Sequence, residues 1–360
     1  MKVVHFADAH IGASTGHGID SATGLNTRVA DYLRCFDEIV DYAIESDVDL
    51  VLFAGDMYQT RNPSQTLQKE VTNRIVRLAE AQIPLVLLEG NHDQQKAFGK
   101  ASSLHIFGVI HGVYVAVEPD VFEIETKSGM VRVVCLPYPA KYDIDEALET
   151  LSLTTDMPTI CLAHVTVVDA VPGSEVHMAL DAEDAVFRSK FDGFDYVALG
   201  HVHRHQSLGN MVYSGSIERS GFYEPESKGF VVVTIEDDVR WEFVPVRARE
   251  YLEVSGDTLE EIAGKLPADL SNTIIRVRAQ EGIDVSGLRK LFVGAHKLES
   301  IIIEQPRHDR RPESVGVESL ELDELMDRYF DSKGFDKDYK DKLFAAFEEM
   351  RECQDIEIVP

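Results

Sequence analysis

The stretch that decides the fold is Met1–Gly12, M-K-V-V-H-F-A-D-A-H-I-G, in which a short apolar run ends in Asp8 and His10. Four later stretches repeat this pattern of a strand-like apolar run followed by polar residues. They are Leu50–Asp56 (L-V-L-F-A-G-D), Leu85–Asp93 (L-V-L-L-E-G-N-H-D), Ile160–His164 (I-C-L-A-H) and Tyr196–His203 (Y-V-A-L-G-H-V-H). Amphipathic helical stretches separate the first three runs, so residues 1 to about 200 predict an α/β fold.

The rest of the chain divides by its pattern into three further parts. From about 207 to 246 strand follows strand, which suggests β-hairpins that close a second sheet between helical layers. Residues 250–304 are typical of a small separate α/β unit, and two amphipathic helical stripes follow a Pro- and Arg-containing segment. We therefore predict a core over 1–248, a small α/β domain over 249–305, a linker over 306–316 and a helix pair over 317–360.

The composition favours a protein of the cell interior. Of the 360 residues 44% are hydrophobic and 27% are charged, and no run approaches the about 18 apolar residues that a membrane span needs. His5 and Asp8 interrupt the apolar N-terminal run, which does not fit a signal peptide. The four cysteines form no C-x-x-C pair: Cys35, Cys135, Cys161 and Cys353. We expect a cytoplasmic protein with no membrane contact, disulfide framework or zinc knuckle.

The charge balance is strongly acidic. The 35 Lys and Arg residues against 63 Asp and Glu give a formal net charge of −28. Taken alone, this argues against a protein that grips nucleic acid by broad neutralisation of phosphates. A high acidic content also serves solubility, and formal charge ignores bound cations. The charge balance therefore does not exclude nucleic-acid binding.

The polar residues at the five strand ends supply imidazole, carboxylate and one amide, with no thiolate. In open α/β sheets the ligand crevice lies beyond the carboxyl ends of the strands, so these residues are expected to converge. The donor set suits Mn²⁺, with Fe²⁺, Zn²⁺ and Mg²⁺ as alternatives. Seven ligands are too many for one ion, whereas two ions that share Asp56 use them naturally. The seven candidates are Asp8, His10, Asp56, Asn91, His164, His201 and His203.

The motifs D-x-H, G-D, G-N-H-D, a separate H and G-H-x-H, in this order, resemble the signature of the calcineurin-like metallophosphoesterases. Within that superfamily the chain looks most like the SbcD-type nucleases, called meiotic recombination eleven in archaea and eukaryotes, over nearly its whole length. Weaker signals of this subfamily are Met1–Gly12 and Val212–Glu218 through Lys228–Phe230. The resemblance implies a two-sheet αββα sandwich, a DNA-capping domain over 249–305 and an ATPase-binding helix pair over 317–360.

The resemblance also assigns roles to single residues. Its implied ligand sets are Asp8, His10, Asp56 and His203 on one ion, and Asp56, Asn91, His164 and His201 on the other. His92 is implied to be catalytic, as the proton donor to the leaving oxygen. Asp93 either orients an imidazole or braces a turn. Archaeal relatives commonly have a histidine where this chain has Gln59. The resemblance to them therefore does not predict the relative strength of exonuclease and endonuclease activity in this chain.

The activity that the resemblance implies is that of a Mn²⁺-dependent DNA nuclease. Such an enzyme is a double-strand exonuclease and a single-strand endonuclease, and it processes DNA ends in double-strand break repair. Its partners are DNA, an SbcC-type coiled-coil ABC ATPase and a second copy of itself. Apolar stripes for the helical interface between the two copies are expected over Thr66–Gln82 and Ala97–Val109.

Two other functions stay open. A metallophosphoesterase for a small phosphodiester or nucleotide leaves the extension over 250–352 unexplained. A non-catalytic scaffold that tethers DNA ends is expected to carry a broken ligand set, and none of the seven ligands is missing. The chain lacks the G-D-x-x-D-R-G arginine of the phosphoprotein phosphatases, which favours a diester substrate.

Overall fold

The computed structural model describes residues 1–13, 18–21, 23–95, 100–140, 142–151, 156–173, 185–304 and 322–353. The chain forms two compact units, Met1–Glu304 and Gln305–Pro360, and each is described by itself. The predicted linker over 306–316, both ends of the predicted helix pair (317–321 and 354–360) and residues 97–99 of an expected interface lie outside the described residues.

The first sheet has six strands in the order β12-β11-β1-β2-β3-β4. The strands are β1 (Lys2–Phe6), β2 (Leu50–Phe53), β3 (Leu85–Leu88), β4 (Val113–Ala116), β11 (Gly229–Ile235) and β12 (Val239–Pro245). β1 to β4 run parallel, and β11 pairs antiparallel with β1. The prediction that the β11–β12 hairpin closes the second sheet is therefore wrong. The hairpin covers β1, whose outer N–H and C=O groups would otherwise be unpaired.

The second sheet also has six strands, in the order β5-β6-β7-β8-β10-β9. They are β5 (Asp120–Thr126), β6 (Gly129–Leu136), β7 (Thr159–His164), β8 (Tyr196–Gly200), β9 (Gln206–Leu208) and β10 (Met211–Tyr213). β6, β7 and β8 run parallel, which brings their carboxyl ends to one end of the sheet. β4 and β5, two outer strands, did not stand out in the sequence.

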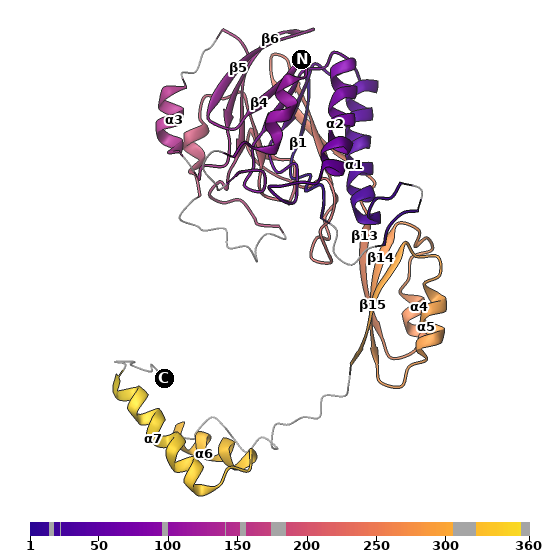
Figure 1. Cartoon of the computed structure of the whole chain (residues 1–360), viewed down its shortest axis with the longest axis vertical. Helices are drawn as coiled ribbons and strands as arrows, with labels where there is room; N and C mark the ends of the chain where they lie inside the picture. The colour runs from indigo at the N-terminus through magenta and orange to yellow at the C-terminus, as the bar shows by residue number, and fades with distance from the viewer. Residues whose placement is uncertain are drawn as a thin grey trace. The chain divides into compact units, whose positions relative to one another are not determined.

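The two sheets pack face to face between helical layers, which confirms the predicted sandwich (Figure 1). The covering helices are α1 (Thr27–Glu45) and α2 (Gln65–Glu80) on the first sheet, and α3 (Ile144–Thr150) and the 3-10 turn η4 (Arg188–Phe191) on the second. Leu52 and Leu162 lie in the layer between the sheets, whereas Phe53 packs toward the helices. Each strand alternates its faces in this way because successive side chains point to opposite sides.

Helix α1 shows how the pattern becomes structure. Its first turn is capped by Asn26, whose side chain accepts the N–H of Arg28. The apolar stripe that includes Leu33 and Phe36 is buried against the first sheet. The ring of Phe36 lies 5.4 Å from that of Phe6 on β1, measured between centroids. An amphipathic face of this kind obtains its stability from such packing.

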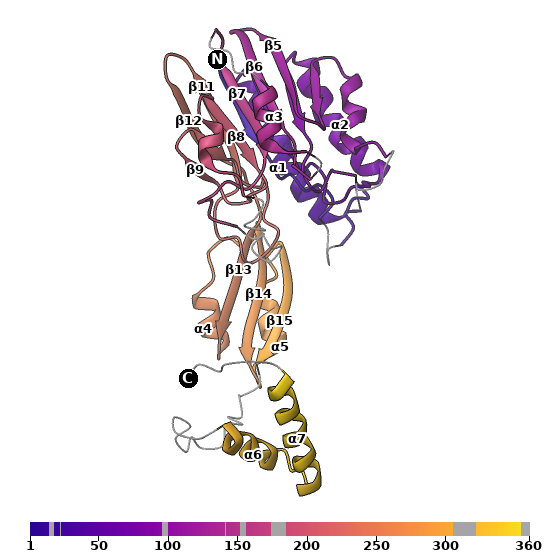
Figure 2. The ribbon, with the colours of Figure 1, turned by 90° about the vertical axis from the view of Figure 1, so that its left-hand side faces the viewer.

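A third sheet of three parallel strands follows the core. Its elements are β13 (Glu250–Gly256), α4 (Leu259–Gly264), β14 (Thr273–Gln280), α5 (Val285–Leu291) and β15 (Lys297–Glu304). These elements alternate between strand and helix, as in the small α/β unit expected over 250–304. Val277 on β14 and Leu288 on α5 belong to its own apolar cluster. The two helices cover one face, and the other face is turned to the viewer in Figure 2.

A buried ionic cluster joins the small sheet to the core. Both carboxylate oxygens of Glu218 accept the N–H of Arg249, at 3.0 and 3.1 Å, just before β13. The same carboxylate lies 3.3 Å from the guanidinium of Arg28, and both side chains are almost fully buried. Arg249 in turn pairs with Asp31 on α1 at 2.6 Å. Buried ion pairs and hydrogen bonds therefore join the small sheet to the core.

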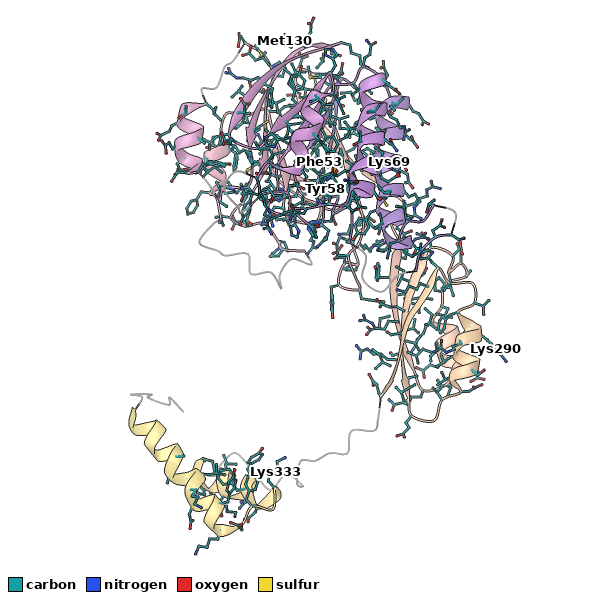
Figure 3. All side chains as sticks on the ribbon, in the orientation of Figure 1. Phe53, Tyr58, Lys69, Met130, Lys290 and Lys333 are labelled. Atoms are coloured by element: carbon teal, nitrogen blue, oxygen red, sulfur yellow. The ribbon has the colours of Figure 1, made fainter. Side chains whose placement is uncertain are left out.

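The second unit contains the helices α6 (Leu322–Ser332) and α7 (Lys337–Cys353). Phe330 is buried between them, with its ring centroid 5.4 Å from that of Phe344. Gly334, at φ 73°, makes the turn, and Figure 3 labels the neighbouring Lys333 on this turn. Throughout the described ranges, no helix is both long and apolar enough to cross a membrane.

Glu218→Ala should lower the free energy of unfolding by about 3–5 kcal/mol, because the buried guanidinium of Arg28 loses one of its two carboxylate partners and the N–H of Arg249 loses its acceptor. The exposed pair of Glu236 and Arg240, which also joins a carboxylate to an arginine, supplies the control. Glu236→Ala should leave the stability nearly unchanged. Denaturant titrations of both variants measure the difference, and equal small losses would contradict the role of the cluster.

Candidate metal centre

The predicted ligands follow strands whose carboxyl ends meet at one end of the sandwich. β1, β2 and β3 run parallel in the first sheet, and β7 and β8 run parallel in the second. Figure 3 shows Tyr58, two residues after Asp56, toward the end of the core from which the small sheet extends, and Met130 at the opposite end. The ligands therefore gather at the end of the core nearest the small sheet.

The backbone adopts unusual conformations where the ligands converge. Asp8, His10, Asp56 and His201 have φ values between 41° and 92°, in the left-handed region that favours glycine. Such residues persist where the surroundings hold them. The N–H of Asp8 donates to the carbonyl of Gly55 at 2.9 Å, and that of His10 donates to the carbonyl of Asp56 at 3.0 Å. The turns after β1 and β2 thus hold each other in place.

Glycines precede several ligands because a side chain at those positions would collide with the centre. A Cβ at Gly90 would lie 2.1 Å from Oδ1 of Asp56, and one at Gly55 would lie 2.3 Å from Nδ1 of His164. A Cβ at Gly200 would lie 2.1 Å from a backbone carbonyl oxygen of the turn after β2. The glycines of the G-D, G-N-H-D and G-H-x-H motifs are therefore a packing requirement.

Asp56 presents one carboxylate oxygen to both halves of the centre. Its Oδ1 accepts the backbone N–H of His92 at 2.8 Å. Its Oδ2 lies 3.7 Å from Nε2 of His10 and 3.5 Å from Nε2 of His164. An oxygen placed between two imidazole nitrogens suits a carboxylate that two cations share.

One half of the centre joins Asn91, His164 and His201. Oδ1 of Asn91 lies 3.0 Å from Nε2 of His164 and 3.1 Å from Nδ1 of His201. Nδ1–H of His164 donates to the carbonyl of Ala54 at 2.6 Å, which orients the ring and makes Nε2 the nitrogen that can bind a metal. These three residues, with Asp56, are the set that the family resemblance implied for one ion.

The other half joins Asp8, His10 and His203. The Nε2 atoms of His10 and His203 lie 3.0 Å apart, and the donor atoms of all three residues lie within 4.8 Å of one another. Both oxygens of Asp8 also accept the N–H of His201, at 3.1 and 3.2 Å. The structure therefore brings all seven candidate ligands together from five strand ends.

His92 lies beside this second half. Its ring meets that of His10 edge to face, with 4.8 Å between centroids. Its Nδ1–H donates to the backbone carbonyl of Gln59 at 2.9 Å, so Nε2 is the nitrogen available for proton transfer. A ring nitrogen of His92 also lies within 4.8 Å of donor atoms of His10 and Asp56. The geometry thus fits a proton donor or a further ligand.

Asp93 braces the turn that follows β2. Its carboxylate accepts the backbone N–H groups of Met57 at 3.0 Å, Tyr58 at 3.1 Å and Gly90 at 3.4 Å. Burial and the nearby Asp56 raise the pKa of Asp93 to about 7, although the three N–H donors act in the opposite direction. Of the two roles considered from the sequence, these contacts fit the structural one.

Three of the four imidazole ligands have the protonation state that metal binding requires. Burial, followed by nearby positive charge, lowers the pKa of His10, His201 and His203 to about 3, so these imidazoles are neutral at pH 7. Burial also acts to lower the pKa of His164, but the carboxylate of Asp56 outweighs it and raises the value to about 9. Neutral imidazoles and ionised carboxylates are the forms that bind divalent cations, so His164 would release its proton when a cation binds beside Asp56. The residues present therefore fit a centre of two cations.

Sequence reasoning missed three residues that support the centre. Lys228, which is buried, donates from Nζ to the carbonyl of His203 at 3.1 Å. Arg61 donates to the carbonyls of Asn91 and Gln94, at 3.2 and 2.6 Å, and so holds the loop after β3. Tyr138 follows β6 and lies beside His164 and His201. The first two act on backbone carbonyls, which no side-chain motif reveals, whereas Tyr138 follows a strand end like the ligands.

The two-sheet fold and the ligands for two cations together are typical of a phosphoesterase with a dimetal centre. The sequence profile of the calcineurin-like phosphoesterases matches residues 1–205, more than half of the chain. The chain therefore belongs to the calcineurin-like phosphoesterase family, and the resemblance seen in its motifs is confirmed at this level.

Several solved structures are similar at low sequence identity. The protein TT1561 of Thermus thermophilus is 12% identical, with 67% of this chain and 98% of that chain covered and a TM-score of 0.39. A dimetal phosphatase from Danio rerio is 12% identical, with 68% and 96% covered and a TM-score of 0.40. YfcE, a phosphoesterase from E. coli, is 12% identical, with 68% and 100% covered and a TM-score of 0.29. The family assignment rests on the match to residues 1–205.

Asp56→Asn should abolish metal-dependent hydrolysis and reduce the number of bound Mn²⁺ ions, because each ion loses a shared oxygen ligand. Calorimetric titration or elemental analysis measures the stoichiometry. Asp195→Asn changes a carboxylate that accepts the N–H of Thr159 outside the centre and serves as the matched control. Two fully bound ions in the Asp56 variant would contradict the bridging role.

Proposed function

We propose that this phosphoesterase is a Mn²⁺-dependent DNA nuclease of the SbcD type, which processes DNA ends in double-strand break repair. The observation that carries the phosphodiesterase part is the position of Oδ2 of Asp56 between His10 and His164. Two ions bound there would stabilise charge on the attacking and leaving oxygens of an in-line displacement. His92, with Nδ1 held by Gln59, would donate a proton to the leaving oxygen.

The small sheet favours a polymeric substrate over a small one. The segment from Arg219 to Lys228 touches both the sheet and the metal centre. At one end the ring of Phe222 packs on Tyr251 of β13, with 4.9 Å between centroids. At the other end Lys228 holds the carbonyl of His203. A polynucleotide cleaved at the centre would reach this neighbouring domain, whereas a small diester would have no use for it.

A second candidate is a phosphodiesterase for a nucleotide or another small diester. The net charge of −28 favours it, because a small diester needs no extended basic surface. The open face of the small sheet does not offset this charge, since the guanidinium of Arg276 pairs with the carboxylates of Glu253 and Glu299. The two candidates share the same centre and differ in what they cleave.

Full-length protein with Mn²⁺ should shorten end-labelled duplex DNA and cut circular single-stranded DNA. His92→Ala should keep both ions and the affinity for DNA while losing about 10²–10⁴-fold in rate, the usual weight of a positioned proton donor. Replacement of the exposed His111 by Ala, outside the metal centre and the expected interface, is the control and should leave the rate unchanged. Turnover of bis(p-nitrophenyl) phosphate or cyclic nucleotides without DNA cleavage would favour the second candidate, and loss of a metal from the His92 variant would make His92 a ligand.

The proposal includes two protein partners. One is an SbcC-type coiled-coil ATPase bound by the helix pair, where Tyr329 and Tyr339 are 57% and 50% exposed. Over 313–357 the chain has six basic and fifteen acidic residues, a net charge of 6 − 15 = −9, which suits a basic groove. The other is a second copy of the chain, in keeping with Ile106 and Val109, which are 45% and 88% exposed on η1 (Ser103–Val109).

Deletion of residues 313–360 should leave Mn²⁺-dependent cleavage of single-stranded DNA nearly intact, because the centre lies wholly in the unit Met1–Glu304. The same deletion should remove co-purification with the ATPase, because two short helices obtain stability by burying their apolar stripes on a partner. Pull-down and nuclease assays on the same preparation measure both effects. Unchanged affinity of the truncated protein for the ATPase would contradict the docking role.

A further inference from the structure

The ring of Tyr138 lines one edge of the metal centre, although no ligand motif includes it. Tyr138 follows β6, which runs parallel to β7, so it lies at the same end of the second sheet as His164. Its ring centroid lies 5.6 Å from that of His201 and 6.3 Å from that of His164. Tyr138 is partly exposed, whereas His164 is fully buried. A partly exposed aromatic residue thus borders the ligands.

The backbone of Tyr138 is fixed to the loop that carries Asn91 and His92. Its N–H donates to the carbonyl of Glu89 at 3.2 Å, and its carbonyl accepts Nε2–H of Gln94 at 3.2 Å. Two hydrogen bonds on either side of one residue leave its backbone little freedom relative to that loop. The backbone that carries the ring is therefore held at a defined place beside the centre, as a substrate-binding surface requires.

Tyr138 and His92 lie next to opposite halves of the centre. His92 contacts the ring of His10, which belongs with Asp8 and His203. Tyr138 contacts the rings of His164 and His201. A phosphodiester bound between the halves carries two organic groups, of which one leaves with the proton from His92. The other group stays on the phosphate and lies away from His92.

We propose that Tyr138 is a specificity-determining residue whose ring stacks on the planar group that the phosphodiester retains after cleavage. The ligand class is a nucleoside base or another aromatic ester group, which presents a π-face to the ring. The inference rests on the proposed phosphodiesterase function and adds a preference between diesters to it. The ring face makes this contact, so phenylalanine can replace tyrosine.

A merely structural role for the ring makes a different prediction. If Tyr138 only packed against His164 and His201, its loss would loosen the ligands and affect every substrate alike. Stacking instead affects only substrates that retain a planar group. Variants at position 138 therefore need to distinguish the effect of side-chain volume from the effect of a planar ring. Tyr138→Leu keeps the bulk beside the histidines, and Tyr138→Phe keeps the ring.

The test compares three diesters that share p-nitrophenolate as the leaving group. They retain a p-nitrophenyl group, thymidine or a methyl group, and full-length protein is assayed with each in Mn²⁺. We expect Tyr138→Leu and Tyr138→Ala to lower kcat/KM for the two planar diesters, relative to the methyl diester, by about 10-fold, mainly through KM. Tyr138→Phe should stay within about twofold of the wild type, and elemental analysis should find unchanged Mn²⁺ content.

The outcomes separate this inference from the function on which it rests. A parallel loss on all three diesters, or lost metal in the Leu variant, would make the ring a support for the histidines and overturn the proposal. A loss in the Phe variant equal to that of Ala would assign the effect to the hydroxyl and also overturn it. If the wild type cleaved none of the diesters and no DNA, the proposed function itself would fail.

Discussion

Two buried carboxylates, Asp8 and Asp56, set the constraint on which the rest of the centre depends. They are 0% and 2% exposed, and buried anions are stable only when opposite charge or hydrogen bonds compensate for the lost water. Three of the four imidazoles around them have a pKa near 3 and bring no charge at neutral pH. His164 alone is held in its charged form, by Asp56. Divalent cations bound by this donor set would supply the missing positive charge.

Bringing these donors together requires backbone conformations that cost free energy, of the order of 1–3 kcal/mol for each residue held in the left-handed region. Hydrogen bonds from the surrounding residues offset this free-energy cost. Asp93 holds the turn after β2, Arg61 holds the loop after β3 and Lys228 holds the carbonyl of His203. Lys228 pairs at 2.6 Å with the buried Glu224, within the segment that also packs on the small sheet. The support of one ligand is thus continuous with the junction between the core and the small sheet.

The sequence predicts the strands that end in ligands because each joins an apolar run to polar residues, a pattern that needs no tertiary information. It does not predict the partner of β11, because a half-buried antiparallel hairpin has the same alternation in either sheet. It also misses the contact between His92 and Gln59. There the backbone carbonyl of Gln59 accepts a hydrogen bond from His92, whereas sequence reasoning considered only the side chain of Gln59. Contacts made by backbone carbonyls depend on where two chain segments meet, and side-chain motifs do not record this.

The charge of the chain and its proposed substrate are compatible once distance is considered. At physiological ionic strength, charges separated by more than about 8 Å are largely screened, so most of the net charge of −28 is not felt at the scissile phosphate. Within that distance two divalent cations outweigh the two ligand carboxylates and leave a local charge near +2. On the small sheet the guanidinium of Arg278 pairs at 2.7 Å with Glu253, which leaves little free positive charge on that face. For the proposed DNA substrate, attraction to the phosphate backbone would therefore act at short range, at the metal centre, and the net charge would govern long-range approach without deciding whether the centre can cleave.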